Sequence, residues 1–408
     1  MAAGGALSRT DRRRDRAARL AGLARLAANG TVAAADISEG VTRAVHDALG
    51  MRTGPAGRTR GLTGFVYRWV RRIARLVGRG AAQAPAATDA ATGTEAGLLA
   101  VLNGVMGDRL AADGNPLAIP MSFWVDGCPA RTVRAGSPHL VLLVHGLCLD
   151  ESCWKARADD ETDVGGVAAH LVDGVAVGVR YNTGRHISDN GADLAVGVQA
   201  LVDGWPVPVR SVTVLAHSMG GLVVRSAFAA AAERGLTWTE RVRAVVCLGT
   251  PHHGSPVERV GWWVHGRLRA GRFSAPLARA AELRSAGVTD LRWGAVRRSD
   301  WHGRDRFGAL DDVRAPLPLP DGVPFYAIAG TTARRRGTAA DRLVGDGLVP
   351  VWSALGEHDD PARRLDFSGT RVLPATGHVR LLTDSAVAAQ LTAWLGARPP
   401  GHPAAARA

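Results

Sequence analysis

Residues 214–221 read Val-Leu-Ala-His-Ser-Met-Gly-Gly, and this stretch decides the fold. An apolar, β-branched run from Ser211 to Leu215 leads into it, and a helix-forming run from Leu222 to Ala232 follows it. The order predicts a strand, a sharp turn at Ser218 and a helix. A turn of this kind lifts a serine hydroxyl off the carboxyl end of a sheet. A serine that only caps the helix is the alternative interpretation.

Small residues stand two positions on either side of the serine, at Ala216 and Gly220. Such a tight turn leaves no room for larger side chains there. With these residues, the segment resembles the nucleophile elbow of the α/β-hydrolase superfamily and, more narrowly, that of serine lipases and esterases. Alanine stands at 216 where glycine is commoner. The resemblance implies that Ser218 is a nucleophile and that an acid and then a histidine follow it in the chain.

An unbroken apolar run, 140–144, precedes this segment and is typical of a central parallel strand covered on both faces. It ends in His145, Gly146 and Leu147. In the resembled family, a His-Gly pair here opens the oxyanion loop. The resemblance therefore implies that the backbone N–H groups of Leu147 and Met219 are the oxyanion donors. We interpret His145 as a residue that supports this loop and not as one that exchanges protons with substrate.

The acid is expected on a loop after a later strand. A strand-like run, Pro324–Gly330, precedes Val-Gly-Asp-Gly-Leu-Val-Pro at 344–350. Its Asp346 lies between two glycines and resembles the Asp-Gly-Leu-Val segment that carries the catalytic acid of bacterial lipases. An exposed loop carboxylate is the alternative role for this residue. The competing acids lie in charged or polar segments; they are Asp341, Asp359, Asp360 and Asp366.

The base must follow the acid, which leaves His358, His378 and His402. His402 stands in a Pro/Ala-rich tail and His358 in a charged loop. His378 follows a short strand-like run, 370–373, and precedes the last helix, as the triad histidine of the family does. We therefore predict that His378 is the general base and that Asp346 orients it.

Strands that alternate with helices predict the α/β class, and the motifs together resemble the α/β-hydrolase fold: a mostly parallel, doubly wound sheet with a helical cap insertion and an N-terminal helical extension. The loop at 181–186 follows another strand, so we expect it to line the site. The predicted segments are a flexible basic arm at 1–32, a helical extension at 33–115, a hydrolase domain at 118–397 with a cap or lid at about 256–322, and a tail at 398–408.

The formal net charge of +13 is concentrated near the N-terminus. Residues 1–80 hold sixteen arginines and five acidic residues, whereas the predicted hydrolase domain is close to neutral, which suits an uncharged ester. Residues at about 62–79 place apolar side chains on one helical face and arginines on the other. This basic amphipathic helix is expected either to contact an anionic membrane or to pack on the hydrolase body. Nucleic-acid binding is disfavoured because aromatic residues are not interleaved with the arginines.

Four cysteines without a Cys-x-x-Cys pair predict neither a disulfide framework nor a metal site. We expect no cofactor and no metal. Similar secreted lipases often bind calcium through an acid two residues after the histidine, and Arg380 stands at that position here. With no apolar signal segment or membrane-spanning stretch, we expect a cytoplasmic or membrane-peripheral setting.

These residues together indicate a serine hydrolase that cleaves carboxylic esters of small molecules or lipids through an acyl-enzyme. The similarity to GPI inositol-deacylase-like hydrolases extends over 140–385 and suggests a lipid ester. An acyltransferase or a thioesterase with the same triad is an alternative. A non-catalytic, membrane-docking scaffold with a hydrolase-like fold is another.

Overall fold

A computed structural model describes residues 93–134, 136–156, 158–255, 284–307, 311–334 and 344–396. The predicted basic arm, the amphipathic helix at about 62–79 and the tail at 398–408 lie outside these residues. Residues 256–283 of the predicted cap do so too. The domain boundaries predicted from the sequence therefore stay predictions.

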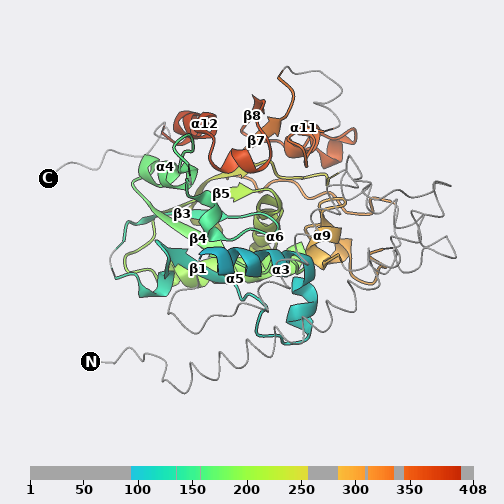
Figure 1. The fold of residues 1–408 in the computed structure, drawn as a ribbon, viewed down its shortest axis with the longest axis horizontal. Helices are drawn as coiled ribbons and strands as arrows, with labels where there is room; N and C mark the ends of the chain where they lie inside the picture. Colours follow the sequence, from blue (N-terminus) through green and yellow to red (C-terminus); the bar gives the residue numbers. More distant parts are fainter. Residues whose placement is uncertain are drawn as a thin grey trace, which may run out of the picture.

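One sheet of eight strands organises the described part of the chain, in the order β2-β1-β4-β3-β5-β6-β7-β8 (Figure 1). Strands β3 to β8 pair in parallel, and β1 is antiparallel to both β2 and β4. This arrangement confirms the predicted mostly parallel sheet. The strands are β1 Ser122–Val125, β2 Cys128–Pro129, β3 His139–Val144, β4 Val175–Arg180, β5 Ser211–His217, β6 Val242–Leu248, β7 Phe325–Thr331 and β8 Gly369–Pro374.

Central strand β3 shows why its sequence has no polar alternation. Leu140, Leu142 and Val144 point into one hydrophobic cluster, and Val141 and Leu143 point into another on the opposite face. Successive side chains of a strand alternate between the two faces, so a strand covered on both sides must be apolar throughout. The unbroken apolar run is therefore the consequence of a two-sided core.

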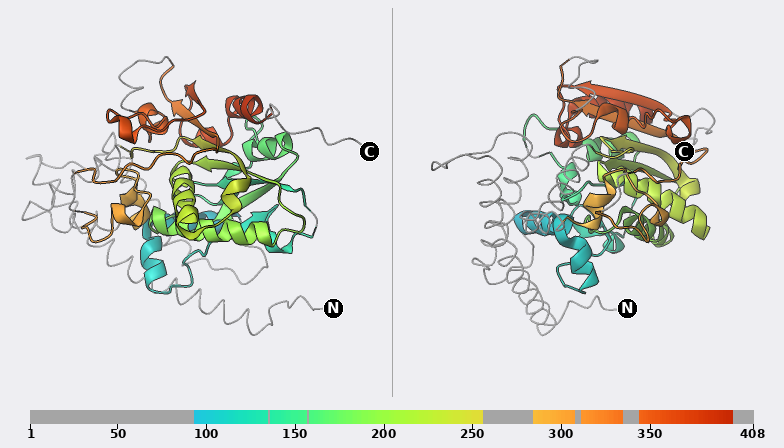
Figure 2. Two further views of the ribbon diagram at one scale, coloured as in Figure 1. Left: turned by 180° about the vertical axis from the view of Figure 1, so that it is seen from behind. Right: turned by 90° about the vertical axis from the view of Figure 1, so that its right-hand side faces the viewer.

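Helices cover both faces of the sheet (Figures 1 and 2). The cluster formed with α5 and α6 occupies one face, and the cluster formed with α4 and α12 occupies the other. Asp384 caps α12, because its side chain accepts a hydrogen bond from the Ala386 amide. The helices are α3 Gly93–Ala112, α4 Val164–Leu171, α5 Ile187–Asp203, α6 Met219–Arg234, α9 Ala286–Asp290, α11 Val351–Ala354 and α12 Ser385–Leu395.

The segment after the undescribed residues 256–283 packs on the N-terminal helix α3. The Ser285 hydroxyl donates to the Gly104 carbonyl, and the Ala286 amide donates to the Asp108 carboxylate at 3.0 Å. Arg306 reaches the same carboxylate at 2.7 Å. None of the helices in the described ranges combines the length and apolarity needed to cross a bilayer.

Helices α5 and α6 approach each other closely at Gly191. A Cβ atom added there would lie 2.2 Å from the Ser226 Oγ and 2.9 Å from the Ser226 carbonyl carbon. A contact this short against backbone cannot be relieved by a side-chain rotation. By contrast, a Cβ atom added at Gly97, also inside a helix, would meet no atom within 4 Å.

We predict that Gly191→Ala lowers the free energy of unfolding by about 1–3 kcal/mol, because the helices must separate to admit the methyl group. The matched substitution Gly97→Ala should raise it by up to about 1 kcal/mol through helix propensity. Urea unfolding of both variants followed by circular dichroism measures the difference. Equal changes in the two variants would contradict the close-packing account.

Candidate active site

Ser218 occupies the sharp turn between β5 and α6. Its backbone angles are φ 54° and ψ −126°, a left-handed conformation that costs a non-glycine residue free energy. Gly220 makes the turn possible, because a Cβ atom there would lie 2.5 Å from the Val144 carbonyl oxygen. A Cβ atom at Gly146 would lie 2.8 Å from the Ser218 Cβ. The small residues in both motifs therefore allow β3 and the elbow to approach closely.

His378 brings its ring between Ser218 and Asp346. Its Nε2 lies 2.8 Å from the Ser218 Oγ, and its Nδ1 lies 2.7 Å from the Asp346 Oδ2. The loops after β7 and β8 are also joined through the main chain, since the His378 amide donates to the Asp346 carbonyl at 3.0 Å. The chain thus places the three predicted side chains in one line of hydrogen bonds. In the sequence, His378 lies 32 residues from Asp346 and 160 residues from Ser218.

Asp346 is held by its own turn. Its Oδ1 accepts hydrogen bonds from the Leu348 and Val349 amides at 3.0 and 2.9 Å, which leaves Oδ2 for the imidazole. The carboxylate is fully buried. Gly345 has φ 55°, and a Cβ atom there would lie 2.0 Å from the Val349 carbonyl oxygen. Glycine before the acid is therefore required by the turn that aims the carboxylate.

Gly249, the residue after β6, lies directly against this pair. Its φ is 57°, and a Cβ atom there would lie 3.0 Å from the Asp346 Oδ2 and 3.2 Å from the His378 Nδ1. Any side chain at this position would therefore press on the His378–Asp346 hydrogen bond. The sequence gives one signal for Gly249, namely that it follows a predicted strand directly. Sequence analysis did not assign it a role.

His145 orients the peptide unit between Gly146 and Leu147. Its Nδ1 lies 3.0 Å from the Gly146 carbonyl oxygen, which also accepts the Leu149 amide at 3.3 Å. A carbonyl only accepts, so the imidazole must carry its proton on Nδ1. Two bonds to this oxygen direct the N–H of the same peptide unit, that of Leu147, to the opposite side. Burial lowers the pKa of His145, so the ring is neutral.

The loop after β4 supports residues 145–148 through two hydrogen bonds. The Tyr181 hydroxyl donates to the His145 carbonyl at 2.6 Å, and the Thr183 hydroxyl accepts the Cys148 amide at 3.1 Å. These two bonds hold the chain on both sides of Leu147. The 181–186 loop therefore lies against the segment from His145 to Cys148, and Tyr181 and Thr183 are buried there. Sequence analysis placed this loop near the site but did not single out either residue.

Met219 provides the second predicted oxyanion amide. It is the first residue of α6, and the first amides of a helix have no acceptor within the helix. They also lie at the positive end of the helix dipole. Gly146 and Ser218, the residues that directly precede Leu147 and Met219, are in close approach. This arrangement suits a developing negative charge.

His217 braces His378 from the strand side. Its Nε2 lies 3.0 Å from the His378 carbonyl oxygen, and the two rings are 4.8 Å apart. Burial and the neighbouring His378 hold the pKa of His217 well below its ordinary value. His217 is therefore a neutral donor that fixes the position of His378.

Arg380 lies two residues after His378. It forms an ion pair with Asp160 at 3.1 Å, and its guanidinium also donates to the Asp160 carbonyl. In the described ranges, no three His, Cys, Asp or Glu side chains gather as metal ligands.

The comparisons with known proteins concern the fold and the segment around Ser218. Residues 194–305, which include β5, the elbow, α6 and β6, match the sequence model of the PGAP1-like α/β domain. The chain has the α/β-hydrolase fold. The family match covers the turn at Ser218 and not the loops of Asp346 and His378. No curated protein matches the sequence.

Solved structures with a similar chain trace include the mature lipase BlEst2 of Bacillus licheniformis, with 20% identity, coverage of 67% of this chain and 97% of that chain, and a TM-score of 0.39. Aspergillus fumigatus lipase B has 12% identity, coverage of 69% and 57%, and a TM-score of 0.41. Pyrococcus furiosus esterase has 15% identity, coverage of 68% and 86%, and a TM-score of 0.34. Because these TM-scores are below 0.5, the fold assignment depends on the topology and the family match.

The buried histidines predict a loss of stability in acid. Burial lowers the pKa of His253 to about 4 from an ordinary value of 6.5. Below pH 6.5 the unfolded chain therefore takes up a proton that the folded protein does not, so stability falls as pH falls. The loss begins near pH 6.5 and is complete below about pH 4.

We expect His253→Gln to reduce this acid-induced loss of unfolding free energy by about 2 kcal/mol between pH 7.5 and pH 5, at about 1.4 kcal/mol per pH unit. Urea unfolding across this range measures it. Above pH 7 the two proteins should differ by a constant amount. If the unfolding free energies of the two proteins stayed parallel over the whole pH range, His253 would have the same pKa in the folded and the unfolded protein.

Proposed function

We propose that this α/β-hydrolase is a serine hydrolase that cleaves carboxylic esters through an acyl-enzyme intermediate. One observation carries the proposal: the hydrogen-bonded line from the Ser218 hydroxyl through His378 to the buried Asp346 carboxylate, at 2.8 and 2.7 Å. Such a line is the arrangement that activates a serine hydroxyl as a nucleophile.

In the proposed reaction, the Ser218 Oγ attacks the ester carbonyl carbon while its proton passes to the His378 Nε2. Asp346 accepts the Nδ1–H bond, which keeps the imidazole in the tautomer that leaves Nε2 free to accept. The tetrahedral intermediate collapses when His378 gives the proton to the leaving alcohol. Water then attacks the acyl-enzyme with His378 again as base, and the carboxylic acid is released.

The Leu147 and Met219 amides are proposed to stabilise the oxyanion. Each such donor typically contributes about 3 kcal/mol to the transition state. His145, Tyr181 and Thr183 support this role by orienting the loop before the substrate arrives. The donors then need no reorganisation as charge develops.

The substrate class is proposed as an uncharged carboxylic ester, because the predicted hydrolase domain is close to neutral in formal charge. That the ester belongs to a small molecule or a lipid stays a prediction. That residues 62–79 contact a membrane is a second prediction, which a vesicle-binding assay can address. No cofactor takes part in the proposed steps.

We predict that a fluorophosphonate probe labels the wild type and that Ser218→Ala abolishes labelling, because the probe reacts only with an activated serine. Hydrolysis of a p-nitrophenyl ester should fall about 10⁶-fold in the same variant. Ser211→Ala, at the start of the strand that leads into Ser218, is the control and should label normally. A folded wild type that neither labels nor hydrolyses any ester would refute the proposal.

For the acid, we predict that Asp346→Asn lowers kcat about 10⁴-fold with little change in KM, because the amide favours the wrong imidazole tautomer. Steady-state kinetics on the same ester measures the effect. Asp366→Asn, a change of the same chemistry at a competing acid outside this line, should leave kcat within about twofold. If Asp366→Asn were the damaging change, Asp346 would not be the acid.

A further inference from the structure

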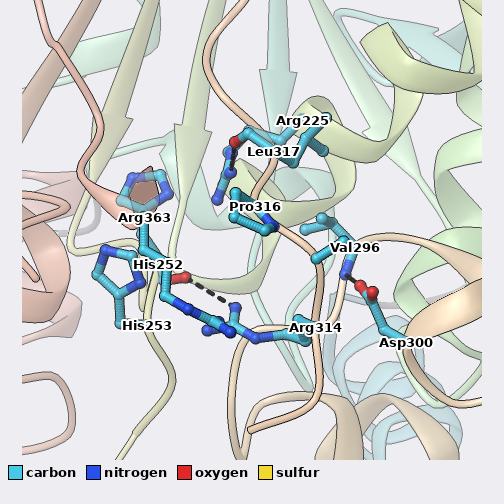
Figure 3. A pocket seen from close by; sticks show the side chains of 10 residues that line it. Arg225, His252, His253, Val296, Asp300, Arg314, Pro316, Leu317 and Arg363 are labelled. Carbon is cyan, nitrogen blue, oxygen red and sulfur yellow. Dashed lines mark hydrogen bonds between the residues drawn. The ribbon is translucent and has the colours of Figure 1, made fainter. Parts of the chain in front are cut away.

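A small cavity lies two helical turns along α6 from Ser218, on the side of the loop that follows β6 (Figure 3). Its volume is about 20 Å³. Basic and imidazole side chains make up most of its polar lining: Arg225 from α6, His252 from the loop, and Arg314 and Arg363 from later segments. Asp300 is the acidic residue among those that line it.

The charges of this lining are not balanced. Arg314 binds both oxygens of Asp312, at 2.8 and 2.9 Å, and Arg363 binds the same carboxylate at 2.9 Å. Asp300 uses its Oδ2 for the amides of Val296 and Arg297. The two arginines therefore share Asp312, and Arg363 also pairs with Asp360 at 3.5 Å.

Arg225 has no acidic partner in the described part of the chain. Its guanidinium donates to the Leu317 carbonyl at 2.6 Å, while its Nε is buried without a hydrogen-bond partner. The side chain is 6% exposed. Burial and the nearby Arg314 lower its pKa to about 10, which still leaves it charged at neutral pH. Asp300 acts on Arg225 only through space, and in the described residues no carboxylate contacts the guanidinium directly, so this buried cation loses its hydration without a directly bonded counter-charge, which is costly.

His252 faces the same space. Its ring is fully buried, and neither ring nitrogen has a hydrogen-bond partner among the residues that the structure describes. Burial and then Arg225 lower its pKa well below the ordinary value, so the ring is neutral and has one N–H to donate. Figure 3 shows the Arg225 guanidinium reaching from α6 toward the side of the pocket that carries His252.

We propose that this cavity binds one chloride ion between the Arg225 guanidinium and the His252 ring. An anion supplies the charge that Arg225 lacks, and it accepts hydrogen bonds from both the Arg225 Nε and the imidazole N–H. Water would satisfy the hydrogen bonds but not the charge. A cavity of about 20 Å³ holds an occupant near the size of one water, which suits a halide and excludes phosphate or sulfate.

The bound chloride would stabilise the loop that also supports the candidate active site. The His252 amide donates to the Ser353 carbonyl at 3.2 Å, and the loop begins at Gly249, which lies against Asp346 and His378. The inference does not depend on the proposed function, because its test is thermal stability and not hydrolysis.

The test compares thermal unfolding of the full chain in sodium chloride and in sodium gluconate at equal ionic strength. Chloride should raise Tm by about 2–5 °C in a saturable way, since a ligand that binds only the folded state stabilises it by mass action. Gluconate, whose anion is too large for the cavity, should give no saturable rise. Equal curves in the two salts would overturn the proposal.

Arg225→Gln should abolish the chloride-dependent rise. Arg243→Gln is the matched control, because Arg243 likewise donates to a backbone carbonyl, that of Leu395 at 2.8 Å, but belongs to neither the cavity nor the loop. It should keep the rise. Retention of the rise in Arg225→Gln would show that chloride acts elsewhere.

A direct measurement covers the case in which Arg225→Gln fails to fold. Crystals of the wild type soaked in sodium bromide should give an anomalous peak beside the Arg225 Nε and the His252 ring. A peak there supports the site. Anomalous density elsewhere only, or none, overturns it.

Discussion

The close approach of β3 to the turn at Ser218 is the constraint on which the rest of the structure depends. The backbone at Val144 lies so near α6 that no side chain fits at Gly220, and Gly146 lies equally near the serine itself. This contact holds the left-handed conformation of Ser218 against its intrinsic cost. It also brings the first amide of α6 beside the loop that begins at Gly146. The proposed nucleophile and the proposed oxyanion donors thus share one packing contact.

Neutral, buried imidazoles surround this contact and act as rigid hydrogen-bonding groups. His145 orients the Gly146–Leu147 peptide unit, and His217 holds the main chain of His378. Burial lowers the pKa of both rings, so each keeps one defined tautomer at neutral pH. A charged ring at either position would be left without hydration and without a counter-charge. Low pH is therefore expected to disturb the support of the candidate site as well as to lower the free energy of unfolding of the protein.

The loop after β6 connects two different environments. At Gly249 it touches the Asp346–His378 pair, and at His252 it borders a cavity that contains the buried cation Arg225. The nearby Thr250 packs against Gly221 of α6, where a Cβ atom would lie 2.1 Å from the threonine Oγ1. The loop is thus held by contacts with α6 along its length. Charge compensation at the His252 end of this loop is the physical reason for the proposed chloride site.

Local features of the chain were enough to predict the parallel sheet, the turn at Ser218 and the order of the three side chains, because strand burial and turn sterics leave apolar runs and small residues in the sequence. The sequence also placed the acid between glycines, since only a local turn aims Asp346. Tertiary structure decided the rest. The roles of Tyr181, Thr183 and Gly249, and the unpaired charge of Arg225, arise from contacts between distant segments. No local pattern records them, because a single hydrogen bond or close approach across the fold imposes no periodicity on the chain.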